Sequence, residues 1–235
     1  MKAFTKPSLT ALALFLTAGS AWAYPVAVGD TVRMYNNDTA VQYEGHYQAD
    51  NISDKAGTFG VFCVELNEYF TPGKNYSVAS ISNGASKGGL YGQTGTNFDP
   101  ISKGTQWLYH HFLLKDIQSV TGVVEKDYQL QLAFWYLENE LDNRVSQNAT
   151  YFDAYHGATG ITTDAEKYVA AAQLAIDRGA FLGDVKVMNL IDASGNYAQS
   201  QLIGQPVPEP STMLLVGTGL IGLGFARRKA QNKTA

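Results

Sequence analysis

The spacing of the apolar residues changes along the chain, and this order restricts the possible fold more than any other feature. Between Tyr24 and about Ser82, Tyr, Phe and Val roughly alternate with polar residues in segments broken by Asn, Asp and Gly clusters. This alternation predicts β-strands. Residues 105–118 and 126–141 instead repeat apolar side chains at helical spacing. The first part of the domain is therefore expected to be sheet and its middle helical.

A third helix and a final pair of strands complete this pattern. Thr163-Asp164-Ala165-Glu166 fits a helix capping box, and Gly179 provides a left-handed stop. The later segments DVKVMNLID and NYAQSQLIG predict a closing β-hairpin. Residues 82–103 and 143–162 are polar or glycine-rich and predict loops. We expect one α+β domain over residues 24–204, strand-rich at its N-terminal part, with about three central helices.

The N-terminal segment predicts export. Residues 1–23 carry Lys2 and Lys6, continue through the apolar stretch LTALALFLTA, and close on Ala21-Trp22-Ala23. A charged start, an apolar centre and a small-residue end are typical of a secretory signal peptide. We expect signal peptidase to recognise Ala21 and Ala23 and to cut before Tyr24, so the mature domain leaves the cytoplasm.

The C-terminal segment, residues 205–235, predicts contact with the inner membrane. Residues 213–226 are uncharged, and a helix of that length reaches only about 21 Å of the roughly 30 Å hydrocarbon core. It is therefore expected to be a short transmembrane helix that spans with help from its flanks. The basic residues that follow are expected to stay on the cytoplasmic side.

The distribution of charge argues against nucleic-acid binding. Both ends are basic, whereas the segment between them holds 11 of the 17 basic residues and all 21 acidic ones. That segment therefore has a formal charge near −10. An acidic surface repels phosphate backbones and anionic headgroups.

The tail resembles a known sorting signal. A Pro-Glu-Pro sequence, a glycine-rich apolar run and a basic cluster follow one another, which resembles the PEP-CTERM sorting signal of Gram-negative bacteria. The resemblance implies recognition by an exosortase, cleavage near Pro-Glu-Pro, and delivery to the cell surface or a biofilm matrix. The residues that carry it are Val207, Pro208, Glu209, Pro210, Ser211, Thr212, Arg227, Arg228 and Lys229.

The single cysteine raises a separate question. Cys63 lies in FGVFCVELNEYF, a strand-like segment, and no second cysteine exists to pair with it. In an oxidising compartment an unpaired thiol is unusual. Three interpretations remain open: an inert buried thiol, a bridge to another molecule, or a thiol committed to another covalent bond.

A second resemblance concerns that thiol. The segments FCVE and QLQLAFWYLENE resemble the thioester domains of bacterial surface adhesins, in which a strand cysteine is joined to a glutamine. The resemblance implies a bond between Cys63 and Gln131, shielded by Phe62 and Trp135. Such a bond would acylate a surface amine or hydroxyl once, so the protein would be an adhesin and not an enzyme. The simpler alternative is a helix that packs its apolar residues into the core and leaves Gln131 on the surface.

Other functions have weaker support from the residues. The four histidines show no paired ligand spacing, and no phosphate-binding glycine loop occurs, so we expect neither metal nor cofactor. The first alternative is a non-covalent structural or carbohydrate-binding matrix protein, which would contact exopolysaccharide through Tyr and Trp rings. A secreted hydrolase is the second, although Glu138 and Glu140 are expected to point to different sides of one helix.

Overall fold

The computed structural model describes the folded part of the chain in several stretches. These are residues 24–36, 47–53, 57–87, 98–141, 146–158 and 160–205, together with 217, 219 and 220. The expected signal peptide and all nine residues of the sorting signal lie outside them. So does nearly all of the expected transmembrane run 213–226. Among the described residues, the longest apolar helices fall short of what a membrane crossing requires.

Six strands form one antiparallel sheet, in the order β3-β2-β1-β4-β7-β8. Strands β7 and β8 form the closing hairpin that the sequence predicts. A separate two-stranded sheet, β5 with β6, lies at the ends of the expected loop 82–103. The strands are β1 (Thr31–Asn36), β2 (Tyr47–Asn51), β3 (Gly57–Val61), β4 (Asn75–Ser82), β5 (Gly84–Ala85), β6 (Asp99–Pro100), β7 (Val185–Ile191) and β8 (Tyr197–Gly204).

The residues that follow β3 close the large sheet on itself. Strands β3 and β8 are its two edges, yet the Leu202 N–H donates to the Phe62 carbonyl at 2.8 Å and the Val64 N–H donates to the Ser200 carbonyl at 3.0 Å. Between these bonds Cys63 lies directly opposite Gln201 as an isolated antiparallel bridge. The strands therefore enclose an apolar interior, which contains Met34, Val61, Val78, Met188, Leu190 and Ile203 among others.

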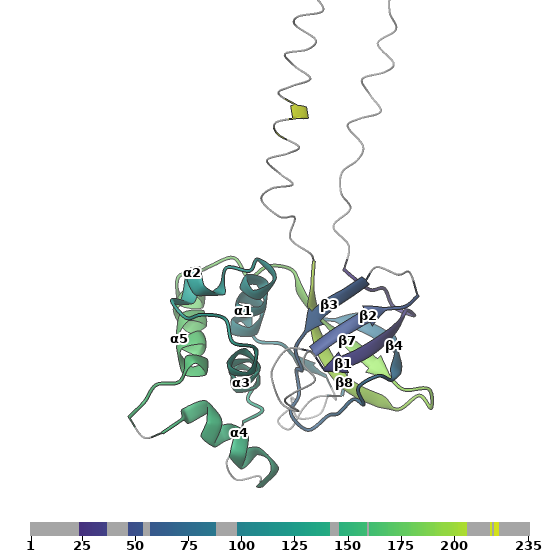
Figure 1. The fold of residues 1–235 in the computed structure, drawn as a ribbon, viewed down its shortest axis with the longest axis horizontal. Coiled ribbons are helices and arrows are strands. Elements are labelled where there is room, and N and C mark those ends of the chain that lie inside the picture. The colour runs from purple at the N-terminus through teal and green to yellow at the C-terminus, as the bar shows by residue number, and fades with distance from the viewer. Residues whose placement is uncertain are drawn as a thin grey trace, which may run out of the picture.

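The helices form a second layer beside the strands (Figure 1). Helices α1 and α3 both pack against α5, and α1 also contacts β7 and β8. A second apolar cluster fills this interface. At its centre Phe62 is fully buried, with ring centroids 4.8 Å from Phe134 and 4.9 Å from Phe112. The helices are α1 (Lys103–Leu113), α2 (Ile117–Thr121), α3 (Asp127–Leu137), α4 (Ser146–His156) and α5 (Asp164–Asp177).

The α+β class is confirmed, but the described residues contain five helices where the sequence predicts about three. Helix α4 lies within residues 143–162, where the sequence predicts a loop. The prediction missed it because its sequence SQNATYFDAYH has no stripe of apolar residues at helical spacing. Two expected helices are also too long. Lys115 and Asn139 have left-handed backbone angles, φ 56° and 61°, and a left-handed residue interrupts a right-handed helix.

Helix α5 begins as the sequence predicts. The Glu166 N–H donates to the Thr163 hydroxyl, and the Thr163 N–H donates to the Glu166 carboxylate at 2.8 Å, so both halves of the capping box are present. Gly179, just beyond its end, has φ 71°, as a left-handed stop requires. Local hydrogen bonds alone were enough to locate this helix.

Candidate functional site

Cys63 is buried in the segment that closes the sheet. Its side chain is 1% exposed, and the thiol is free. Burial raises the pKa of this thiol far above its ordinary value, and the nearby Glu65 carboxyl raises it further, although an amide hydrogen bond from Gln201 opposes the change. A thiolate is therefore strongly disfavoured here. Any reaction of this sulfur requires that its proton be removed as the new bond forms.

Gln131 reaches Cys63 from helix α3, but it contacts the backbone of this residue. Its Oε1 accepts from the Cys63 backbone N–H at 2.9 Å, and its Nε2 donates to the Cys63 carbonyl at 2.8 Å. The side chain is 1% exposed, so the alternative of a surface glutamine is wrong. Both bonds go to the Cys63 backbone. Its N–H and C=O point away from β8, to the side on which a further strand would otherwise pair with them. Gln131 thus holds the strand in place.

A second glutamine, which the sequence analysis missed, faces the sulfur itself. The Gln201 amide Nε2 lies 3.6 Å from the Cys63 Sγ, and a C–N bond of about 1.33 Å places the amide carbon within about 4.9 Å of the sulfur. The Gln201 side chain is fully buried, and its Oε1 has no hydrogen-bond partner in the described structure. The cross-strand bridge fixes this contact, because directly opposed residues place their side chains on the same face.

The expected shielding residues are both buried but have different surroundings. Phe62 packs among the rings of Tyr109, Phe112 and Phe134. Trp135 lies one helical turn beyond Gln131 and packs edge-on against Tyr151, with ring centroids 5.1 Å apart. The Trp135 indole N–H is buried without a hydrogen-bond acceptor among the described residues. The segment that carries Cys63 is therefore packed against aromatic rings, and the thiol is itself buried, which limits the access of water to it.

Several carboxyl groups gather beside the cysteine, contrary to the expectation from the sequence. Helix α3 ends at Leu137, so Glu138 and Glu140 lie in the turn that follows it and not on the helix. Both are buried: the Glu138 carboxylate accepts from the Ser102 N–H at 3.0 Å, and the Glu140 carboxylate accepts from the Leu66 N–H at 3.1 Å. Glu68, Glu140 and Asp99 are the acidic groups that act on Glu65, a further buried carboxyl group.

Glu65 is the most unusual member of this acidic group. Its side chain is 1% exposed, and neither carboxyl oxygen receives a hydrogen bond from a described N–H. Burial, followed by a side-chain hydrogen bond with Glu68 and the charges of Glu68, Glu140 and Asp99, raises the pKa of Glu65 to about 10. Glu65 is therefore neutral at pH 7.

This protonation predicts how stability depends on pH. The pKa of Glu65 is about 10 in the folded state, whereas its ordinary value is 4.5. The contribution of this group to stability is therefore complete below about pH 4.5 and is lost as the pH rises towards 10. We expect Glu65→Gln to stabilise the protein at pH 9 by at least about 1.4 kcal/mol, the worth of one pKa unit. Chemical denaturation between pH 5 and pH 9 measures this. The exposed Asp153→Asn serves as control, and equal slopes for wild type and Glu65→Gln would contradict the assignment.

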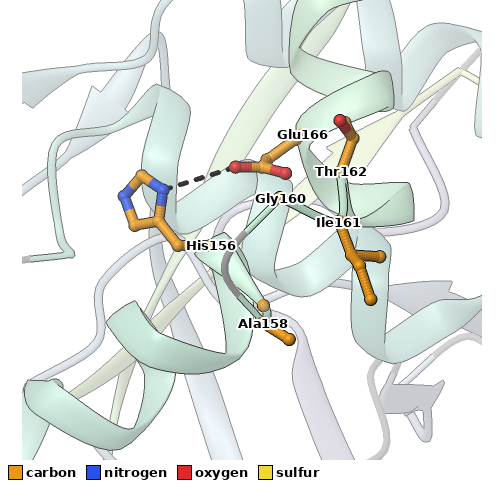
Figure 2. Close-up of a pocket in the computed structure, with 7 residues that line it drawn as sticks. His156, Ala158, Gly160, Ile161, Thr162 and Glu166 are labelled. Carbon is orange, nitrogen blue, oxygen red and sulfur yellow. Dashed lines mark ion pairs between the residues drawn. The ribbon is translucent and has the colours of Figure 1, made fainter.

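A surface hollow of about 340 Å³ provides a separate candidate site. Figure 2 shows His156 and Glu166 facing each other across it, with His156 Nδ1 3.3 Å from Glu166 Oε1. The Glu166 carboxylate is already committed to the capping box of α5, and the neighbouring Thr163 hydroxyl donates to the Tyr155 carbonyl. These polar groups are explained by the start of a helix, so they give no specific indication of a ligand.

The histidines do not form a metal centre in the described part of the chain. His111 pairs with Asp116 at 2.8 Å on the surface of α1, while the adjacent His110 packs against Phe181. Burial, together with the charge of His111, lowers the pKa of His110. No group of three or more potential metal ligands occurs among the residues that the structure describes.

Comparison with known proteins identifies the tail of the chain and not its domain. The PEP-CTERM protein-sorting motif matches residues 206–229. No curated protein and no solved structure matches the chain. The resemblance to a sorting signal is therefore confirmed, whereas the resemblance of the central domain to thioester domains has no support from these comparisons. The motif implies an extracellular protein that an exosortase sorts, with export and transient membrane anchoring before its release at the cell surface.

Proposed function

We propose that this exosortase substrate is a surface adhesin whose exported domain attaches covalently to its target through an internal thioester at Cys63. The sorting motif accounts for its delivery to the cell surface or to an extracellular matrix. The domain would then make one bond to an amine or hydroxyl of a neighbouring surface, such as an exopolysaccharide. Because each molecule reacts once, the protein is not an enzyme.

One observation carries this proposal: a buried thiol has glutamine amides on both sides. Gln131 contacts the Cys63 backbone and Gln201 contacts the Cys63 sulfur. Attack of Sγ on a glutamine Cδ forms the S–C bond, breaks the C–N bond and releases ammonia, while the thiol proton passes to the departing nitrogen. The burial of Cys63 and Gln201 limits access of water to the product.

Geometry favours Gln201 over Gln131 as the acyl donor. The sequence resemblance assigns that role to Gln131, but both ends of its amide are held by the Cys63 backbone. The Gln201 amide instead faces the sulfur, and its carbonyl oxygen has no described donor. An unpaired buried oxygen destabilises the amide by about 1–3 kcal/mol, which favours its conversion. In this proposal Gln131 positions the thiol, and Gln201 supplies the acyl group that the Cys63 sulfur receives.

Intact mass tests the proposal directly. The exported protein is expected to be lighter than its sequence by about 17 Da, the mass of one ammonia lost when the thioester forms. Cys63→Ala removes the nucleophile and should restore the full mass. Methylamine treatment of the wild type should release the thiol and change the mass from about 17 Da below to about 14 Da above that of the sequence, because the amine is added to the acyl group. A wild-type protein of full mass, with Cys63 alkylated completely after mild unfolding, would show that no thioester forms.

A non-covalent carbohydrate-binding function is the alternative with structural support. Tyr69 is 70% exposed and Tyr197 is 47% exposed, and the Gln199 N–H donates to the Tyr69 carbonyl, which joins their two segments. Exposed aromatic rings stack on sugar rings. If exopolysaccharide binds equally well to the wild type and Cys63→Ala, this alternative is favoured. A secreted hydrolase has less support, because the gathered carboxyl groups Glu65, Glu138 and Glu140 are buried instead of lining a cleft.

A further inference from the structure

Strand β8 contains one extra residue just before Gln201. Opposite the single residue Asn189 of β7, it has two residues, Gln199 and Ser200. An extra residue of this kind is a β-bulge, which re-aims the side chains beside it and is common next to functional sites. The pairing of β4 with β7 also shifts register at Asn189, so the sheet is irregular on both sides of this residue.

The bulge decides on which side of β8 the Gln201 side chain lies. Side chains of a regular strand alternate, so Ala198 and Gln201, three positions apart, would lie on opposite sides. They pair instead with Leu190 and Met188, which are two positions apart on β7 and share one side. Cys63 lies directly opposite Gln201 on the other edge of β8 and shares that side as well. The extra residue therefore turns Gln201 towards Cys63.

The Asn189 side chain holds one residue of the bulge in place. It is fully buried, and both ends of its amide are hydrogen-bonded. Its Oδ1 accepts from the Ser200 hydroxyl at 2.9 Å and from the Ser86 N–H at 2.8 Å. Its Nδ2 donates to the Ser82 hydroxyl at 3.0 Å. These bonds tie the bulge to β4 and to the segment that follows it.

The other residue of the bulge contacts the Gln201 amide itself. The Gln201 Nε2 lies 3.4 Å from the Gln199 carbonyl and 3.6 Å from the Cys63 sulfur, so this nitrogen is held between the two. The Gln199 side chain is buried, and its Nε2 donates to the Glu65 carbonyl at 2.6 Å, on the segment that carries Cys63. The bulge is therefore bonded to the thiol segment on one side and to β7 on the other.

We propose that this bulge positions Gln201 for attack by Cys63, and that Asn189 is a positioning residue for thioester formation. The inference rests on the proposed function. Asn189 acts on the reaction through Ser200 and the course of β8. A displacement of about 1 Å, caused by a change remote from the reacting atoms, can lower a rate about 10²-fold. A buried clamp on the bulge therefore has a direct effect on the rate at which sulfur and amide carbon meet.

The test follows the loss of about 17 Da, one ammonia, by intact mass as the full-length chain refolds. The chain is recovered unfolded from inclusion bodies in denaturant under reducing conditions, and folding is followed in parallel by circular dichroism. Once folded, Asn189→Ala should lose this mass about 10- to 100-fold more slowly than the wild type. Ser200→Ala removes the hydroxyl that bonds Asn189 and should also be slower, whereas Ser200→Thr keeps the hydroxyl and should retain the wild-type rate.

Asn51→Ala is the matched control, because it removes another fully buried asparagine from the same sheet. The Asn51 Nδ2 donates to the Pro25 carbonyl at 3.0 Å and to the Asp30 carboxylate at 2.8 Å, so the variant should lose stability but keep the wild-type rate of mass loss.

The positioning role is overturned if folded Asn189→Ala reacts at the wild-type rate, or if Asn51→Ala slows equally. If Asn189→Ala fails to fold, the serine variants decide: Ser200→Ala at the wild-type rate, or Ser200→Thr as slow as Ser200→Ala, overturns the role. A wild-type chain that folds and keeps its full mass refutes the proposed function and this inference with it. The variant results, by contrast, bear on the positioning role alone.

Discussion

Methylamine is expected to label Gln201 and not Gln131 in the wild-type protein. Aminolysis of a thioester converts the acylated glutamine into its N-methyl amide, which adds about 14 Da to that residue alone. Gln201 is the expected site because its Nε2 lies 3.6 Å from the Cys63 sulfur, while the Gln131 amide pairs with the Cys63 backbone at 2.9 Å and 2.8 Å. Peptide mapping by tandem mass spectrometry locates the label without any substitution.

Substitution of each glutamine by methionine tests the same assignment, because only loss of the acyl donor should abolish thioester formation. Gln201→Met keeps a side chain of similar length but has no acyl group, so the mature protein should keep its full mass and a free thiol. Gln131→Met should still form the thioester, but it leaves the Cys63 N–H and C=O without partners and should cost about 1–3 kcal/mol of unfolding free energy. A label on Gln131, together with an intact thioester in Gln201→Met, would reverse the two roles.

Removal of the sorting motif is expected to abolish delivery to the cell surface. Replacing Pro208, Glu209 and Pro210 by alanine leaves the export signal and the folded domain intact, because the domain ends before residue 206. The variant should remain associated with the inner membrane and keep its C-terminal segment, whereas the wild type should be processed and released. Fractionation followed by intact mass measures both.

The matched control for this second prediction keeps all residues of the motif and changes one residue beyond it. Lys233→Ala lies after residue 229, where the matched motif ends. It should be sorted like the wild type. Surface release of the triple alanine variant at the wild-type level would show that exosortase recognition does not depend on Pro-Glu-Pro in this protein. It would leave the thioester proposal untouched.

Local patterns predicted a large part of the fold. The α+β class, the closing hairpin β7–β8 and the start of α5 all depend on neighbouring residues, namely strand alternation and a capping box whose hydrogen bonds join residues three positions apart. The sorting motif was equally readable, because a linear signal is recognised as sequence. Phe62, Gln131 and Trp135 are all buried, although the resemblance from which they were chosen stays a prediction.

Tertiary structure alone decided which groups meet. Gln201 is 138 positions from Cys63, and no local pattern announces that the chain after β3 returns to pair with β8. Helix α3 ends at Leu137, and the chain turns at Asn139, which has a left-handed backbone. This turn leaves Glu138 and Glu140 both buried, with Glu140 near Glu65, although helical spacing predicted different sides of one helix. Sequence determined the address and the local elements, because these depend on short-range interactions. Sheet closure determined the chemistry of the thiol, because burial and cross-strand contact exist only in the folded domain.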